Sequence, residues 1–314
     1  MRDVYIINPK AGKRDTALQF MERVKAWHAS NGGEHEIRLT QCAGHGEEIA
    51  REYAESGEQL RLWAVGGDGT ILEVVRGAAY HENVAVGAFP NGSGNDFIKT
   101  FGAKEIFMNF DKQMHGEPVV VDMIHTEHGD AVNICSLGLD AKVANEMTRY
   151  KQIPGVTGES AYVISLVKCL FGKLTDKMTV RLWNEKDEVE TYSGDYVFAL
   201  AGNGKWYGGG FCGAPKAVPN DGLLEFVLIQ KPAYHRIPRL VGVYKNGRHL
   251  DDDSYADVVT YVRGTKMEII SESALVSTMD GNCVKSDHEC FEVMPGALRF
   301  ILPQGISVPT GAEK

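Results

Sequence analysis

The sequence predicts a three-layer α/β domain at the N-terminus, followed by a domain that is mainly an antiparallel β-sandwich. Two observations predict this fold class. Strand and helix patterns alternate over roughly the first 100 residues, which is typical of a parallel sheet with right-handed crossovers. Many short strand patterns separated by turns follow from about residue 118, which is typical of a sandwich.

Four apolar segments and the helical spacing between them define the first domain. Strands are expected at residues 4–7, 36–39, 62–65 and 84–89. Helices are expected in the three intervals between these strands, because apolar side chains recur there at helical spacing. In the first interval these side chains are Ala17, Phe20, Met21, Val24 and Trp27.

The second domain shows strand patterns at residues 119–123, 131–136, 178–183, 196–201, 223–229, 258–262, 267–270 and 298–302. Only two helices are expected among them, around residues 160–172 and 234–245. The boundary is predicted in the turn near residue 118, which gives domains at residues 1–120 and 121–314. Whether the extreme C-terminus packs on the first domain or on the second stays open.

Composition excludes several classes of protein. A formal net charge of -9 over 314 residues argues against nucleic acid as a partner. Six cysteines without a CxxC pair, and an N-terminus that begins directly with a strand pattern, predict a reducing cytoplasm. The longest apolar stretch, residues 161–171, contains Lys168 and is far shorter than the ~20 residues needed to cross a bilayer.

The segment Gly66-Gly67-Asp68-Gly69-Thr70 directly follows the third predicted strand and precedes a helix. Ligands bind at the carboxyl ends of strands in such sheets, and a helix N-terminus offers unpaired N–H groups to a phosphate. Asp68 would repel phosphate unless a cation lay between them. The loop therefore predicts ATP bound with Mg²⁺, although a helix-capping Asp in an ordinary corner is the alternative.

Two further loops favour a binding site over an ordinary strand–helix corner. The first strand is followed by NPKAGK at residues 8–13, and the fourth by PNGSGNDF at residues 90–97. Both are glycine-bearing and both end strands of the same parallel sheet. Three such loops at one edge predict an anion-binding crevice.

Together these loops resemble the diacylglycerol kinase catalytic domain, whose family includes sphingosine and ceramide kinases. In the second domain, GNG at 202–204, GGG at 208–210, AP at 214–215 and DGLL at 221–224 also resemble that family. The resemblance covers nearly the whole chain in the right order. It implies two domains with an active site in the cleft between them.

The resemblance implies roles for individual positions. Nucleotide contacts fall on Asn8, Pro9, Lys10, Ala11, Gly12, Thr40, Gly66, Gly67, Asp68, Gly69, Thr70, Ile71, Leu72, Glu73, Ser93 and Asn95. Lys13, Asp68 and Asp96 match polar positions of the catalytic cleft, and Lys99 stands where the family has an arginine. A structural Mg²⁺ is implied at Asp221, with backbone carbonyls of Val218 and Leu223; without the resemblance, Asp221-Gly222 reads as a hairpin turn.

One motif departs from the family. Its Asp-Gly-Glu, whose Glu is the general base, is replaced here by Asp280-Gly281-Asn282. Asn282 cannot accept a proton. Either Asp280 serves as base, another carboxylate such as Glu289 does, or the enzyme works without one.

These observations predict a cytoplasmic kinase, peripheral to the membrane, that transfers the γ-phosphate of ATP to a lipid hydroxyl, with diacylglycerol the leading acceptor and phosphatidic acid the product. Its partners would be a lipid with a free hydroxyl and, transiently, a membrane surface; a homodimer is left open. Two alternatives stay open. One is a kinase of a water-soluble substrate, of the NAD kinase type, and the other is a nucleotide-binding regulatory protein.

Overall fold

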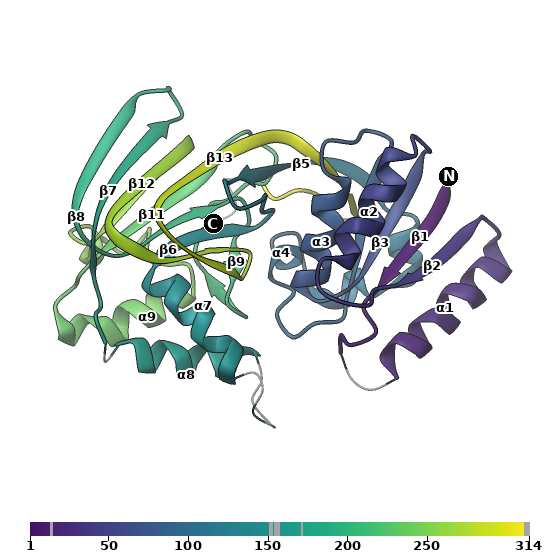
Figure 1. Ribbon diagram of the computed structural model, residues 1–314, viewed down its shortest axis with the longest axis horizontal. Coiled ribbons are helices and arrows are strands. Elements are labelled where there is room, and N and C mark those ends of the chain that lie inside the picture. The colour runs from purple at the N-terminus through teal and green to yellow at the C-terminus, as the bar shows by residue number, and fades with distance from the viewer. Residues whose placement is uncertain (13–14, 151–152, 154–157, 171, 311–314) are drawn as a thin grey trace. The chain divides into compact units, whose positions relative to one another are not determined.

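The computed structural model describes residues 1–12, 15–150, 153, 158–170 and 172–310. The chain divides into two compact units (Figure 1). The first unit contains Met1–Val121 and Gly296–Val308, and the second contains Asp122–Pro295 together with the chain from Pro309 onward. The last part of the chain before residue 309 thus belongs to the first unit.

The first unit is built on four parallel strands in the order β4-β3-β1-β2. They are β1 (Arg2–Ile7), β2 (His35–Leu39), β3 (Leu60–Gly66) and β4 (Val84–Pro90). Ile7 pairs with both Leu39 and Val65, and Val65 pairs with Phe89. This register brings the ends of all four strands to the same edge of the sheet.

Helices cover both faces of this sheet. α2 (His45–Glu55) and α3 (Asp68–Ala78) lie together and contact strands β1, β3 and β4 (Figure 1). On the other face, alternate side chains of the strands pack against α1 (Thr16–Asn31) and α6 (Phe110–Met114). Tyr5, Trp63 and Phe89 form that aromatic layer with Phe20 and Phe110. Two short helices, α4 (Asp96–Lys99) and α5 (Lys104–Phe107), follow β4.

The second unit is an antiparallel β-sandwich. Its strands are β5 (Glu117–His125), β6 (Ile134–Gly138), β7 (Asp176–Asn184), β8 (Val189–Gly202), β11 (Leu224–Gln230), β12 (Val259–Met279) and β13 (Asn282–Leu302), with a small hairpin of β9 (Trp206–Tyr207) and β10 (Phe211–Cys212). β5 and β13 also contribute residues to the first unit. β8 pairs with β7 along its first part and with β6 and β11 along its second.

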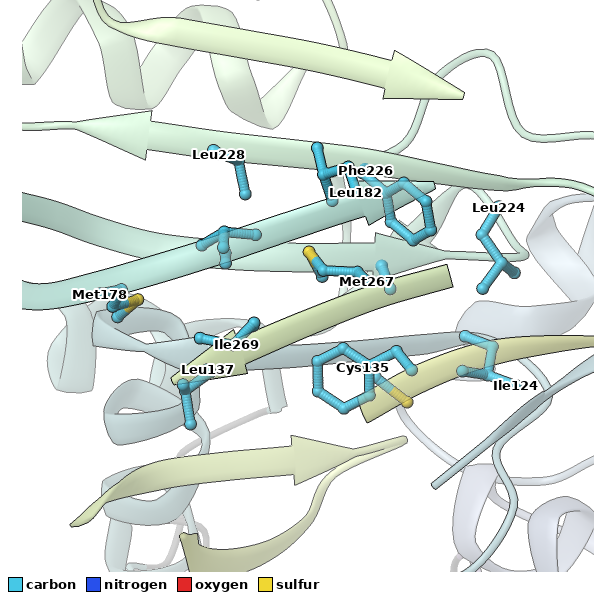
Figure 2. Packing of buried hydrophobic residues seen from close by; sticks show 14 of the residues in the cluster. Ile124, Cys135, Leu137, Met178, Leu182, Leu224, Phe226, Leu228, Met267 and Ile269 are labelled. Carbon is cyan, nitrogen blue, oxygen red and sulfur yellow. The ribbon is translucent and has the colours of Figure 1, made fainter. Parts of the chain in front are cut away.

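Long strands therefore pass from one set of partners to another. β12 pairs successively with β11, β7 and β6, and with β13, and its register shifts between Ile270 and Leu275. Side chains of alternate residues point to opposite faces of these strands. Leu224, Phe226 and Leu228 of β11 lie in the interior of the sandwich (Figure 2), whereas Val227 and Ile229 lie in a second cluster beneath helices.

Three helices form the layer over that second cluster: α7 (Leu139–Tyr150), α8 (Gly158–Leu170) and α9 (Ile237–Lys245) (Figure 1). The sequence predicted α8 and α9 but not α7, and this expectation was wrong. Leu139, Ala141 and Val143 alternate like a strand, which hides the helical spacing of the segment. β6 ends at Gly138, whose φ of 111° turns the chain into α7, but a single glycine in the sequence does not show that a helix follows.

Candidate functional site

Two asparagines join the loops at the carboxyl edge of the parallel sheet. The Asn8 side chain donates to Thr70 Oγ1 at 3.2 Å, and its backbone N–H donates to the Val65 carbonyl at 3.0 Å. The Asn91 side chain donates to the Ala11 carbonyl at 3.0 Å. The structure thus brings together the three loops that the sequence assigned to one crevice, although Asn91 itself was not singled out.

Asp68 fastens the third loop to the Gly-Gly-Asp-Gly-Thr loop. Its two carboxylate oxygens accept hydrogen bonds from the backbone N–H groups of Asn95 and Asp96, both at 2.6 Å. The Asn95 backbone has a left-handed φ of 52°. Its side chain in turn accepts from the Gly92 N–H at 3.1 Å and donates to the Gly92 carbonyl at 2.6 Å. The geometry of the loop therefore depends on the Asp68 carboxylate.

Glycines are required where these loops touch. A Cβ on Gly92 would lie 2.6 Å from the Gly67 Cα. A Cβ on Gly94 would lie 2.6 Å from Asp68 Oδ2 and 3.4 Å from Asp96 Oδ2. Both distances to the nearest atom are shorter than real contacts. The carboxylates of Asp68 and Asp96 therefore face the same side-chain-free stretch of backbone.

Lysines lie close to these carboxylates. Lys99 pairs with Asp96 at 2.6 Å, and Lys104 donates to the Gly92 carbonyl at 3.0 Å. Lys10 is exposed, and its backbone N–H donates to Asn8 Oδ1 at 3.0 Å. Lys13, predicted to act on the phosphates, lies outside the described residues. The Lys99 side chain thus holds Asp96 with one ammonium group, without the paired donors of an arginine.

Other predicted nucleotide positions lie behind the loops. Thr40 is buried, and its N–H donates to the Ile7 carbonyl at 2.9 Å. The Glu73 carboxylate accepts from the N–H groups of Gly44 and Gly46 at 2.9 and 3.0 Å, where α2 begins. Ile71 and Leu72 are buried in the core, whereas Ser93 is exposed. Glu73 therefore positions α2 relative to α3.

In the second unit, Asp280 and Gly281 form the tight turn between β12 and β13, both with positive φ. The Asp280 carboxylate accepts hydrogen bonds from the N–H groups of Val132 at 2.8 Å, Asn133 at 3.2 Å and Ile134 at 2.7 Å. Backbone donors of this kind stabilise the ionised form of a carboxylate. Asn282 follows the turn and is exposed.

Glu289 on β13 is completely buried. Neither of its carboxylate oxygens has a hydrogen-bond partner among the described residues, and Oε1 lies 3.4 Å from the His128 imidazole Nε2. Burial raises the pKa of the Glu289 carboxyl, and the His128 imidazole opposes this shift. A side chain so enclosed is poorly placed to receive a proton from a substrate.

Asp221, the implied Mg²⁺ ligand, forms an ion pair with Arg263 of β12. Its other oxygen accepts the Leu223 N–H at 3.1 Å, and the Val218 carbonyl accepts the Asn220 N–H at 2.8 Å. In the described part of the chain, no three His, Cys, Asp or Glu side chains are grouped to hold a metal ion. With an arginine on its carboxylate, this loop does not fit a divalent cation.

An apolar pocket, partly open to solvent, lies in the second unit under α7, α8 and α9. Leu166, Leu240 and Val241 line it from the helices, and Val197 and Phe198 line it from β8. Tyr207 and Phe211 also line it.

One wall of the cavity carries polar groups. The Asp140 carboxylate accepts hydrogen bonds from the Ser136 hydroxyl at 2.7 Å and the Tyr162 hydroxyl at 2.9 Å. The hydroxyls of Tyr207 and Tyr244 lie 3.1 Å apart. Burial raises the pKa of Asp140, and these hydroxyl donors oppose the shift. No local sequence pattern predicts this group, because its five members come from five separate elements.

The comparisons with known proteins agree with this architecture. Residues 3–127 match the diacylglycerol kinase catalytic domain, and residues 133–302 match the YegS C-terminal NAD kinase beta sandwich-like domain. A protein of Stenotrophomonas maltophilia named "Probable lipid kinase YegS-like" is 27% identical over 96% of both chains. One of the same name from Chromohalobacter salexigens is 29% identical, over 96% of this chain and 93% of its own.

Among solved structures, a diacylglycerol kinase from Bacillus anthracis superposes with a TM-score of 0.72 at 19% identity, covering 98% of both chains. At this identity the likeness is one of fold. Fold and sequence matches together define a two-domain protein of kinase type, with an α/β domain and a β-sandwich, which confirms the predicted fold class.

The second family match alone spans more than half of the chain. The chain therefore belongs to the family of YegS-like lipid kinases, which carry the diacylglycerol kinase catalytic domain, and the resemblance inferred from its motifs is confirmed.

Proposed function

We propose that the protein transfers the γ-phosphoryl group of ATP to a hydroxyl group of a lipid. The observation that carries this proposal is the Asp68 carboxylate, which binds two backbone N–H groups at 2.6 Å and so assembles the glycine loops at the sheet edge. Such loops and the N-terminus of α3 present N–H groups to an anion. Phosphoryl transfer depends chiefly on positioning and electrostatic stabilisation, which a preassembled edge supplies.

Asp68 would hold Mg²⁺ with the nucleotide, and Asp96 would join it when Lys99, now paired with Asp96 at 2.6 Å, pairs with the phosphates instead. The carboxylates of Asp68 and Asp96 face the backbone of Gly94 without an intervening side chain, which suits a cation shared with phosphate oxygens. When bound, the ion would neutralise charge on the transferred group. Asn8, Thr70 and Asn91 fix the surrounding backbone, and Glu73 fixes α2 behind it.

The apolar cavity supports a lipid acceptor over a water-soluble one. Its lining of leucine, valine and phenylalanine side chains suits an acyl chain, whose transfer from water is favourable by about 0.8 kcal/mol for each CH₂ buried. The relatives named as lipid kinases and diacylglycerol kinases support the same choice. Diacylglycerol, giving phosphatidic acid, is the first acceptor to test.

We propose that the reaction uses no general base from the β12–β13 turn. Asp280 is engaged with three backbone donors, and Asn282 has no proton affinity. A base contributes roughly 10²–10⁴-fold, so the rate would be lower than with a glutamate at position 282. This same feature favours the nucleotide-binding regulator as the second candidate function.

The acceptor would be reached at a membrane surface. Ile164 and Val167 on α8 are exposed by 40% and 49%, and the inner side of the same helix lines the cavity through Tyr162 and Leu166. No helix in the described ranges is long and apolar enough to cross a membrane. We propose peripheral, transient binding; an active site between the two domains remains a prediction from the sequence.

The test is transfer of labelled γ-phosphate from ATP to lipids in mixed micelles, with NAD as the water-soluble comparison. We expect phosphorylated diacylglycerol and no labelled NADP. Leu166→Trp, which fills the cavity, should raise KM for long-chain diacylglycerol at least about tenfold while ATP binding is unchanged. Val189→Trp, at an exposed position of β8, is the matched control.

Transfer to NAD alone would identify the water-soluble alternative. ATP binding without transfer to any acceptor would identify the regulator. Equal effects of the two tryptophan variants would remove the cavity from the argument.

A further inference from the structure

The loop that contains Asp221 is tied to two strands of the second unit. On one side, Asp122 of β5 accepts a hydrogen bond from the Gly222 N–H at 2.8 Å, and its own N–H donates to the Pro219 carbonyl at 2.8 Å. On the other side, the guanidinium of Arg263 on β12 binds the Asp221 carboxylate. Protein groups therefore hold the Asp221 loop in place and neutralise the charge of its carboxylate.

Arg263 occupies the middle of a group of carboxylates. Its Nε donates to Glu225 Oε1 at 3.0 Å, its Nη2 donates to Asp221, and its Nη1 lies 3.9 Å from Glu185 Oε2. Glu225 is only 2% exposed and also accepts the Tyr261 hydroxyl. A planar guanidinium matches several carboxylates at once, so this side chain supplies the positive charge that the buried Glu225 requires.

A magnesium ion requires near-octahedral oxygen ligands. At this loop the Asp221 carboxylate is already paired with the Arg263 guanidinium, which Glu225 holds in place from its other side. An ion on the same carboxylate would also lie beside the fixed guanidinium charge and be repelled by it. The residues that the family resemblance implies as metal ligands are thus present here. Their carboxylate, Asp221, is paired with the guanidinium of Arg263 and not with a metal ion.

We propose that Arg263 replaces the structural divalent cation at Asp221 in this chain. The guanidinium neutralises Asp221 and Glu225 and fastens the loop to β12, so the second unit needs no metal for its stability. All magnesium dependence of the protein then belongs to the nucleotide. This inference does not depend on the kinase reaction, because its test requires no turnover.

The test is thermal unfolding of the full chain without nucleotide, after chelation, across a series of MgCl₂ concentrations. We expect the wild-type Tm to move by less than about 1 °C, and metal analysis after dialysis to find no bound magnesium. Arg263→Gln leaves Asp221 and Glu225 without their cation. It should lower Tm and make Tm rise saturably with MgCl₂, as mass action requires for a ligand of the folded state.

Adding Asp221→Asn to Arg263→Gln should remove that rise. Arg181→Gln is the matched control, since Arg181 pairs with Glu268 at 2.9 Å on a strand of the same unit; it should acquire no response to magnesium. If Arg263→Gln does not fold, the wild-type titration and metal analysis still decide. A saturable rise of the wild-type Tm that Asp221→Asn abolishes, or one tightly bound magnesium per chain that it removes, would overturn the proposal.

Discussion

The two units use half-buried carboxylates that bind backbone groups at different distances along the chain. In the first unit, Asp68 binds N–H groups 27 and 28 residues away, on a loop that ends a strand of the same sheet. In the second unit, Asp280 binds N–H groups 146 to 148 residues away, on the segment before β6. Both carboxylates accept backbone donors, yet only the first stands among glycine loops that suit a phosphate.

The difference shows how little a carboxylate's sequence motif says about its role. A Gly-Gly-Asp-Gly-Thr loop at the end of a parallel strand has its function set by the sheet edge. An Asp-Gly turn between two long antiparallel strands takes its partners from whichever strand lies alongside. Removing the Asp68 carboxylate should therefore lower activity more than stability, whereas removing the Asp280 carboxylate should lower stability more than activity.

The largest expected effect is that of Asp68→Ala on activity. Without this carboxylate the loop at Asn95 and Asp96 loses its anchor, and misplacement by about 1 Å can cost roughly 100-fold in rate. We expect kcat/KM for ATP to fall at least about 100-fold, with the far-UV circular dichroism spectrum unchanged. Asp111→Ala, which removes a carboxylate bonded to the Trp27 indole on the same unit, should keep near wild-type turnover.

Asp280→Ala should act mainly on stability. It leaves three backbone N–H groups without an acceptor, and we expect the free energy of unfolding of the second unit to fall by at least about 3 kcal/mol. Denaturant unfolding measures this, with Asn282→Ala as the neighbouring exposed control, expected within about 0.5 kcal/mol. Should Asp280→Asn reduce kcat tenfold while stability is unchanged, Asp280 would be the general base after all.

The smallest expected effect concerns Glu289. Because burial raises its pKa above the value in the unfolded chain, the folded state binds this proton more tightly. The contribution of the Glu289 carboxyl to the free energy of unfolding is fully present below its unfolded-state pKa. It is lost as pH rises through its folded-state pKa. Glu289→Gln should therefore raise Tm at neutral pH and leave it unchanged at acidic pH.

The surrounding ionisable groups set the size of that change. His128 approaches Glu289 at 3.4 Å and opposes the rise of its pKa, whereas Glu127 adds to that rise. In the His128→Gln background, the Tm difference between Glu289→Gln and its parent should therefore change more steeply with pH. A Tm difference between Glu289→Gln and wild type that is the same at acidic and neutral pH would mean that packing, and not ionisation, is responsible.

The sequence by itself determined which glycine loops meet at the carboxyl edge of the parallel sheet. Glycine loops after three strands of one parallel sheet must meet at its carboxyl edge, so residues 8–12, 66–70 and 90–97 could be brought together from local patterns alone. The strand patterns of the sandwich located most of its strands, but they missed residues 271–279 of β12 and 282–297 of β13. The sequence did not predict helix α7, because the apolar residues at its start alternate with polar ones as in a strand.

Only the tertiary structure decided the partners of the buried charges and the shape of the cavity. Arg263 reaches Glu225 across 38 residues of sequence and Tyr162 reaches Asp140 across 22, and no local spacing specifies either pair. A buried carboxylate must find donors wherever strand pairing places them, because leaving it unpaired costs more than any local preference contributes. Motifs therefore identify such residues, but packing assigns what they do.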